Sequence, residues 1–223
     1  MTQRKIILYD PAVFNFAKTV QNLYNACFDN RITDLSFLHQ ELVRAKTHYD
    51  VFNEYTDQDS MFHTLFYENM EKEFLPLYEK FIHEYIRPLY QEKIVYQKKP
   101  TFRAHLPNNL SVGAYHRDRD YHHATTEQNY WVPLTPAFGT NTLWVETEEN
   151  KGDFQPQELD CGKILIFDGA NLRHGNKINT TGKTRVSFDF RIVPFSQFID
   201  SDRTTITAHT KLTIGDYFDI SDY

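Results

Sequence analysis

The apolar positions of the first ninety residues recur with the 3.6-residue period of α-helices. A first series follows Pro11, a residue that suits the first turn of a helix, and comprises Val13, Ala17, Val20, Tyr24 and Cys27. A second series follows Asn30 at the same intervals and comprises Leu35, Leu38, Leu42, Ala45 and Tyr49. The two series predict two amphipathic helices, each with one face that packs against the rest of the protein.

A third, aromatic-rich series starts near Asp59 and extends to Tyr85, which predicts a longer helix. Pro76 should kink or divide this helix, because proline lacks the N–H group that an interior turn needs, and Pro88 should end it. The aromatic stripe would suit a hydrophobic ligand groove or a face packed on a sheet, and we expect the packed face. The helical part is therefore expected to cover about residues 11–92.

From about residue 94 the apolar period changes to two residues, which is typical of half-buried strands. Turns rich in Pro, Asn and Gly separate the predicted strands, which are 101–106, 112–118, 129–134, 141–146, 163–167 and 184–193. Helices followed by many short antiparallel strands indicate an α+β fold, with a sandwich, barrel or jelly roll over about residues 94–195. We expect residues 196–223 to form an extended flap or edge segment of the same single domain, residues 1–223.

The strand predicted at 184–193 has two different faces. One face is apolar, and we expect the helical layer to cover it: Val186, Phe188, Phe190 and Ile192. The opposite face is polar and carries Arg185, Ser187, Asp189 and Arg191. A polar face on an otherwise buried sheet lines a site or faces solvent.

The composition narrows the class of protein. Of 223 residues, 40% are hydrophobic and 24% charged, as in an ordinary globular domain. A net charge of −6 argues against a nucleic-acid-binding surface. The N-terminal apolar run is too short for a signal peptide, and no stretch approaches the roughly 18 apolar residues of a membrane span. We therefore expect a cytoplasmic protein without nucleic-acid or membrane partners, and Cys27 and Cys161 as free, buried thiols, with one bridge between them as the alternative.

His116 and Asp118 form a His-x-Asp motif at the end of the strand predicted at 112–118. Residues two apart on a strand point the same way, with Cα atoms roughly 6.5 Å apart, so imidazole and carboxylate can converge on one metal ion. The motif alone is weak, since it often arises by chance. His174 strengthens it, because this residue follows a buried strand and a turn in the run Lys-Ile-Leu-Ile-Phe-Asp-Gly-Ala-Asn-Leu-Arg-His-Gly. Two histidines and one carboxylate form a facial triad that leaves three coordination positions open.

Arg185 follows His174 by eleven residues and lies on the polar face of the next predicted strand. The open positions of the triad fit a 2-oxo acid bound through two atoms, together with dioxygen. The Arg185 guanidinium can then bind the far carboxylate of 2-oxoglutarate in a two-bond fork, and Ser187 can add a hydroxyl donor. These residue types predict an iron site with an adjacent anion site.

Several segments of the predicted strands resemble one family of enzymes. The segments are Thr-Phe-Arg-Ala-His-Leu-Pro (101–107), Tyr-His-Arg-Asp (115–118), Asn-Tyr-Trp-Val-Pro-Leu-Thr (129–135), Asn-Thr-Leu-Trp-Val-Glu (141–146), Phe-Asp-Gly-Ala-Asn-Leu-Arg-His-Gly-Asn (167–176) and Thr-Arg-Val-Ser-Phe-Asp-Phe-Arg (184–191). Over about residues 95–195 the chain is similar to the StrG-type oxygenases of streptomycin biosynthesis, relatives of the phytanoyl-CoA and ectoine hydroxylases. The helical N-terminus and the C-terminal tail match only loosely.

The resemblance implies a double-stranded β-helix, a jelly roll of the cupin type, behind an N-terminal helical layer. It implies Fe(II) at His116, Asp118 and His174, with 2-oxoglutarate and O2 as cosubstrates and Arg185 as the 2-oxoglutarate arginine. Related halogenases replace the triad carboxylate with Gly or Ala. Asp118 therefore favours hydroxylation, or another oxidation such as desaturation, over halogenation.

Further polar residues are candidates for the same site. Asn129 and Trp131 share a strand face and are expected to contact 2-oxoglutarate or substrate; Arg103, His105 and Arg117 are substrate candidates, with satisfied structural roles as the alternative. The predicted function is a 2-oxoglutarate-dependent dioxygenase that hydroxylates an aliphatic C–H of a small polar metabolite, such as an amino acid, an amino sugar or a natural-product intermediate. The alternatives are a non-catalytic cupin-like binding protein and a metal-dependent cupin isomerase, neither of which needs an arginine eleven residues past the last ligand.

Overall fold

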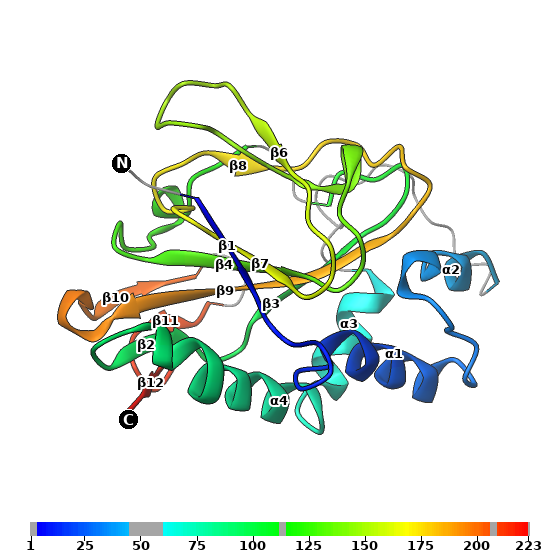
Figure 1. Ribbon diagram of the computed structural model, residues 1–223, viewed down its shortest axis with the longest axis horizontal. Helices are drawn as coiled ribbons and strands as arrows, with labels where there is room; N and C mark the ends of the chain where they lie inside the picture. The colour runs from blue at the N-terminus through cyan, green and yellow to red at the C-terminus, as the bar shows by residue number, and fades with distance from the viewer. Residues whose placement is uncertain (1–3, 45–59, 112–114, 206–208, 223) are drawn as a thin grey trace.

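The computed structural model describes residues 4–44, 60–111, 115–205 and 209–222. The helix positions Ala45, Tyr49 and Asp59 lie outside these residues, as do residues 112–114 of the strand expected at 112–118. Helices lie on one side of a large sheet, and a smaller sheet lies on its other side (Figure 1). The chain is therefore arranged in layers, with the large sheet in the middle.

The helical layer consists of short helices separated by turns. The α-helices are Phe16–Cys27 (α1), Gln40–Arg44 (α2), Met61–Asn69 (α3) and Phe74–Phe81 (α4); turns of other helix types cover Leu35–Phe37, Ile82–Ile86 and Arg87–Leu89. Helix α1 begins after Asn15, not after Pro11. The Asn15 side chain accepts a hydrogen bond from the Lys18 backbone N–H, which caps the helix and sets where it starts.

The helix expected to run to Tyr85 is divided, but the break lies at residues 70–73, before Pro76. Pro76 lies in the first turn of α4, where its missing N–H costs no helical hydrogen bond. Pro88 lies in the turn Arg87–Leu89, which ends the helical layer as predicted.

The large sheet has seven strands in the order β1-β7-β4-β9-β2-β12, and β3 also pairs with β9. Its strands are Lys5–Leu8 (β1), Ile94–Gln97 (β2), Thr101–His105 (β3), Gln128–Pro133 (β4), Lys163–Phe167 (β7), Arg185–Pro194 (β9) and Phe218–Ser221 (β12). The small sheet, β6-β5-β8, has the strands Leu143–Val145 (β5), Gln155–Gln157 (β6) and His174–Gly175 (β8). A separate ribbon joins Ser201–Thr204 (β10) to Lys211–Leu212 (β11), and the C-terminal segment, expected as a flap or edge, supplies the edge strand β12.

Between β3 and β9 the chain passes back and forth between the two sheets. It lies in the large sheet at β3, β4, β7 and β9, and in the small sheet at β5, β6 and β8. His116, between β3 and β4, forms an isolated bridge to His174 of β8 and so adds to the small sheet. All pairings between the named strands are antiparallel, which confirms the predicted α+β class.

The apolar face of β9 packs against the helices, as its alternation predicts. Phe188 is fully buried among the rings of Phe16, Phe74 and Tyr78, at centroid distances of 4.8, 5.3 and 6.3 Å. A second apolar cluster lies between the sheets and includes Trp131, Val145, Leu165 and Phe167. The polar face of β9 therefore points into the space between the two sheets.

Two expectations from composition can be compared with the structure. Cys27 and Cys161 are both free thiols, as predicted, but the expectation that they are buried was wrong: Cys27 is exposed and Cys161 is partly exposed. Among the residues that the structure describes, no helix combines the length and the apolar character that crossing a membrane requires.

Candidate metal centre

Two histidines lie directly opposite each other at the edge of the small sheet. The His116 backbone N–H donates to the His174 carbonyl at 3.1 Å, and the His174 N–H donates to the His116 carbonyl at 2.9 Å. This bridge holds the two imidazole rings close together, with centroids 4.7 Å apart.

Asp118 reaches the same point through a turn. It begins a 3-10 helix, Asp118–Tyr121, and its backbone N–H donates to the Gly169 carbonyl at 2.9 Å. The predicted strand 112–118 therefore does not include Asp118: Arg117 is still extended, but Asp118 begins a helical turn where its backbone N–H is bonded to Gly169. The side chains of His116 and Asp118 nevertheless converge.

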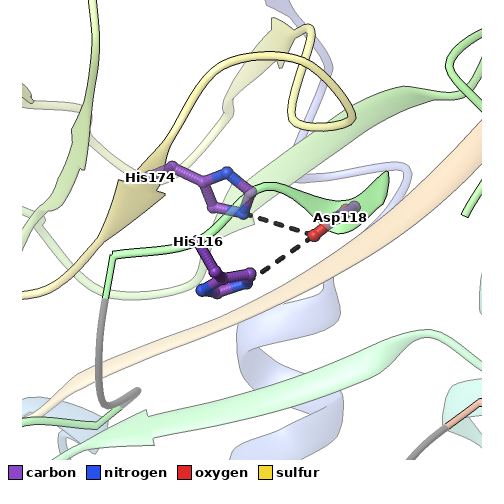
Figure 2. A group of neighbouring side chains, drawn as sticks. All are labelled: His116, Asp118 and His174. Atoms are coloured by element: carbon purple, nitrogen blue, oxygen red, sulfur yellow. Dashed lines mark ion pairs between the residues drawn. The ribbon is translucent and has the colours of Figure 1, made fainter. Parts of the chain in front are cut away.

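The three side chains surround one point (Figure 2). Asp118 Oδ1 lies 3.5 Å from His174 Nε2 and 3.7 Å from His116 Nε2, and the ligand atoms are all within 4.8 Å of one another. Metal bonds of about 2 Å at right angles would separate such atoms by roughly 3 Å. A small inward movement of the side chains would therefore suffice to hold an ion.

Hydrogen bonding also prepares His174 to act as a ligand. Its Nδ1 lies 3.0 Å from the Leu172 carbonyl, which can accept only from an N–H. Nδ1 therefore carries a proton, and Nε2, which lies toward Asp118, is the atom that would bind a metal ion.

The second oxygen of Asp118 is held from the opposite side. Arg191 Nε and Nη2 donate to Asp118 Oδ2 at 3.0 and 2.7 Å, and Asn129 Nδ2 donates to the same atom at 2.7 Å. Burial alone would raise the pKa of the Asp118 carboxyl, but Arg191 and the nearby histidines hold it well below its ordinary value. Asp118 is therefore a buried anion, only 2% exposed.

Strand register explains why Asn129 and Arg191 act together. The two residues are direct partners across β4 and β9, so their side chains leave the sheet on the same face. Gly169 gives Asn129 its room, because a Cβ at this glycine would lie 2.6 Å from Asn129 Cγ. Asn129 was expected to contact 2-oxoglutarate or substrate. In the structure its side-chain amide donates to the Asp118 carboxylate. The contact of Arg191 with Asp118 was missed, although the polar face of its strand was a usable signal.

Arg185 lies further along the same face of β9 and is 2% exposed. Its Nε donates to the Asn141 carbonyl at 2.9 Å and its Nη1 to Ser187 Oγ at 2.6 Å. The Trp131 indole N–H also donates to Ser187 Oγ, at 3.2 Å, and the Arg185 guanidinium carbon lies 5.5 Å from the centre of the Trp131 ring. Arg185 and Ser187 thus share one face of β9, as the sequence predicted, and Trp131 packs beside them.

His105 supports this cluster from behind. It is the register partner of Arg185, is fully buried, and lies 3.4 Å from Arg185 Nη2 through its Nδ1. Burial and the neighbouring Arg185 charge lower the pKa of His105 to about 3, so the ring is neutral. Its Nε2 lies 2.8 Å from the Asn109 carbonyl and its Nδ1 lies 3.3 Å from the Asn141 carbonyl; the shorter contact assigns the proton to Nε2 and leaves Nδ1 to accept from Arg185. His105 therefore has the structural role that was the alternative to substrate contact.

The other two substrate candidates differ in position. Arg103 lines the central cavity, where its Nε lies 3.0 Å from Asp189 Oδ1 in a largely buried ion pair. Arg117 instead bonds Asp120 and Asn150 and lies outside the residues that line the cavity. Arg103 therefore remains a candidate for substrate contact, whereas Arg117 lies outside the cavity lining.

One cavity joins the groups described above. The side chains that line it include the triad, both arginines of β9 and Arg103, with apolar walls; they are Arg103, His116, Asp118, Asn129, Trp131, Leu143, Phe167, His174, Gly175, Asn176, Arg185, Asp189 and Arg191. Two imidazoles and one carboxylate on one side of an open cavity are the donor set of non-haem iron sites. The residues present therefore fit Fe(II), with room beside it for small ligands.

The fold has known counterparts. A solved structure of a non-haem monooxygenase, ThoJ in complex with nickel, aligns with 98% of this chain and 84% of its own, with a TM-score of 0.50 and 13% identical residues. At 13% identity the similarity concerns the fold alone. This chain therefore has a fold that a non-haem monooxygenase also has. CytC3 with Fe(II) and alpha-ketoglutarate matches 80% of this chain and 69% of its own at a TM-score of 0.44 and 15% identity, which is too low to support a conclusion.

Sequence comparison defines the family. The streptomycin biosynthesis protein StrG of Streptomyces griseus is 41% identical over 164 residues, which is 74% of this chain and 78% of StrG. The chain belongs to the StrG family, as its strand motifs predicted. No protein-family model matches the sequence.

Proposed function

We propose that this protein is a non-haem Fe(II)- and 2-oxoglutarate-dependent dioxygenase built on a double-stranded β-helix. The alternation of successive strands between the large and small sheets supports the β-helix. The observation that carries the activity is that a His-His-Asp cluster and the buried Arg185 line one cavity. A facial triad alone would suit several metal proteins, whereas the added arginine suits a dicarboxylate cosubstrate.

In this proposal each group has a defined task. His116, His174 and Asp118 Oδ1 hold Fe(II), which supplies the activation of dioxygen when it is bound. Arg185 binds the far carboxylate of 2-oxoglutarate, and Ser187 orients the guanidinium and adds a hydroxyl donor. The indole of Trp131 fixes Ser187 through its N–H and forms the wall beside it.

The substrate is proposed to be a small polar metabolite that is hydroxylated at an aliphatic C–H. Arg103 and Asp189 form a largely buried ion pair on the cavity wall, which suits a ligand with polar or charged groups. StrG is a protein of streptomycin biosynthesis, which favours a natural-product intermediate such as an amino sugar over an ordinary amino acid. Retention of the carboxylate at Asp118 favours hydroxylation over halogenation.

The direct test is turnover of the cosubstrate. Purified protein with Fe(II) and O2 is expected to convert 2-oxoglutarate to succinate slowly even without its substrate. His174→Ala is expected to abolish this reaction while the melting temperature of the metal-free protein changes little, since His174 lies at the edge of a two-residue strand. Succinate formation by His174→Ala at the wild-type rate would remove this residue from the site. Metal binding without 2-oxoglutarate binding would favour the cupin-like binding protein or isomerase instead.

A further inference from the structure

Asp118 presents its two oxygens to different surroundings. Oδ1 faces the two histidine Nε2 atoms, at 3.5 and 3.7 Å. Oδ2 faces away from them and accepts hydrogen bonds from Arg191 Nε, Arg191 Nη2 and Asn129 Nδ2. A carboxylate oxygen has two lone pairs, so three N–H donors saturate Oδ2. Only Oδ1 remains available to an ion between the histidines.

Arg191 is itself fixed on its other side. Its Nη1 donates to Gln97 Oε1 of β2 at 3.1 Å and to the Tyr217 hydroxyl, just before β12, at 2.8 Å. Glu127 adds a second carboxylate, with Oε2 3.6 Å from Arg191 Nε. The guanidinium is therefore held by groups from several segments, and it cannot follow Asp118 if the carboxylate rotates.

We propose that Arg191 is a positioning residue that makes Asp118 a one-oxygen metal ligand. This inference rests on the proposed function, because it takes Asp118 as a ligand of the iron. A six-coordinate ion with one atom each from His116, His174 and Asp118 keeps three positions open. A second oxygen from Asp118 would occupy one of them, and a 2-oxo acid bound through two atoms would then leave no position for dioxygen.

A guanidinium near a divalent cation also repels it, so two effects of Arg191 oppose each other. The repulsion acts between the Arg191 guanidinium and the metal ion, which the Asp118 carboxylate separates. The two hydrogen bonds from Arg191 to Oδ2 fix the direction in which Oδ1, the ligand atom, points. Groups that orient metal ligands contribute about 10- to 100-fold to metal affinity. We therefore expect orientation to outweigh repulsion, and loss of Arg191 to weaken metal binding.

The test measures Mn(II) binding by the electron paramagnetic resonance signal of free Mn(II), which needs no turnover. Arg191→Met is expected to raise the dissociation constant about 10- to 100-fold. Arg191→Lys keeps the charge without the fork and is expected to give a smaller rise; it carries the test if Arg191→Met does not fold. Arg103→Met is the matched control, because Arg103 lines the same cavity and pairs with a carboxylate, Asp189, that is not a ligand. Its Mn(II) dissociation constant is expected to stay at the wild-type value.

Asp118→Ala separates the two levels of the argument. If Asp118→Ala binds Mn(II) as tightly as wild type, the proposed metal site is wrong. If Asp118→Ala weakens binding while both Arg191 variants bind Mn(II) as well as or better than wild type, the metal site stands and the positioning role of Arg191 is refuted. An equal loss in Arg103→Met would also refute it, because the effect would then follow from any cavity arginine.

Discussion

Replacement of Arg185 by leucine is the sharpest test of the cosubstrate site. Arg185 is almost fully buried in the cavity that the triad lines, where it donates to the Asn141 carbonyl and the Ser187 hydroxyl and lies beside the His105 ring. A dicarboxylate bound to the iron through its 2-oxo acid end can place its other carboxylate against this guanidinium. Leucine keeps an apolar stem but is shorter and offers no donor, so Arg185→Leu removes the anion site and leaves the triad in place.

The expected loss follows from the kind of contact removed. Truncating one partner of a buried, hydrogen-bonded charge pair costs about 2–5 kcal/mol of binding free energy. At about 1.4 kcal/mol per decade, the 2-oxoglutarate dissociation constant should rise roughly 30- to 4,000-fold. The Asn141 carbonyl also loses a buried donor, which should cost about 1–3 kcal/mol of folding stability. For a chain of this size that predicts a melting temperature lower by roughly 2–12 °C.

The assay is anaerobic titration of 2-oxoglutarate into Fe(II)-loaded protein, followed by the metal-to-ligand charge-transfer absorbance. Arg185→Lys should recover part of the affinity, since the charge remains while the fork geometry is lost. Arg103→Leu provides the control for the loss of an arginine from the same cavity and should bind 2-oxoglutarate normally. An unchanged dissociation constant in Arg185→Leu, with Fe(II) still bound, would show that Arg185 is a structural residue and would refute the reasoning.

Two further predictions concern the support of the site and the core. Gly169→Ala should displace Asn129 from Asp118, because the new Cβ would lie 2.6 Å from Asn129 Cγ, and should therefore weaken Mn(II) binding. In an Asn129→Ala background the same substitution should reduce Mn(II) affinity little. An undiminished loss of affinity in that background would contradict the steric argument. Phe188→Ala should lower the free energy of unfolding by about 3–5 kcal/mol in denaturant titrations, whereas Phe195→Ala, at a ring that is 45% exposed, should change it by under about 0.5 kcal/mol. A comparable loss in both phenylalanine variants would contradict the packing argument.

Side-chain pattern predicted those parts of the fold where burial is one-sided. The strands predicted at 101–106, 129–134, 163–167 and 184–193 correspond to β3, β4, β7 and β9 with ends that agree within one residue. The apolar and polar pattern predicts less well those strands that pair through their backbone without burying one face. In β1, Ile6 and Leu8 are 55% and 67% exposed, yet the strand pairs with β7 along its whole length. The three residues of β6 and the two of β8 are too short to show any period.

The three residues that the structure brings together at the candidate metal centre could be predicted, but their supporting contacts could not, and strand register explains the difference. A period of two tells which residues share a face, and it placed Arg185, Ser187, Asp189 and Arg191 together. If the pairing of two strands shifted by two residues, each side chain would stay on the same face of the sheet but would have a different neighbour on the adjacent strand. Only the observed register makes Asn129 the partner of Arg191, and so brings both donors to the same oxygen of Asp118. The choice of Asp118 over Asp189 as the carboxylate for Arg191 therefore depends on pairing that the residue pattern alone leaves open.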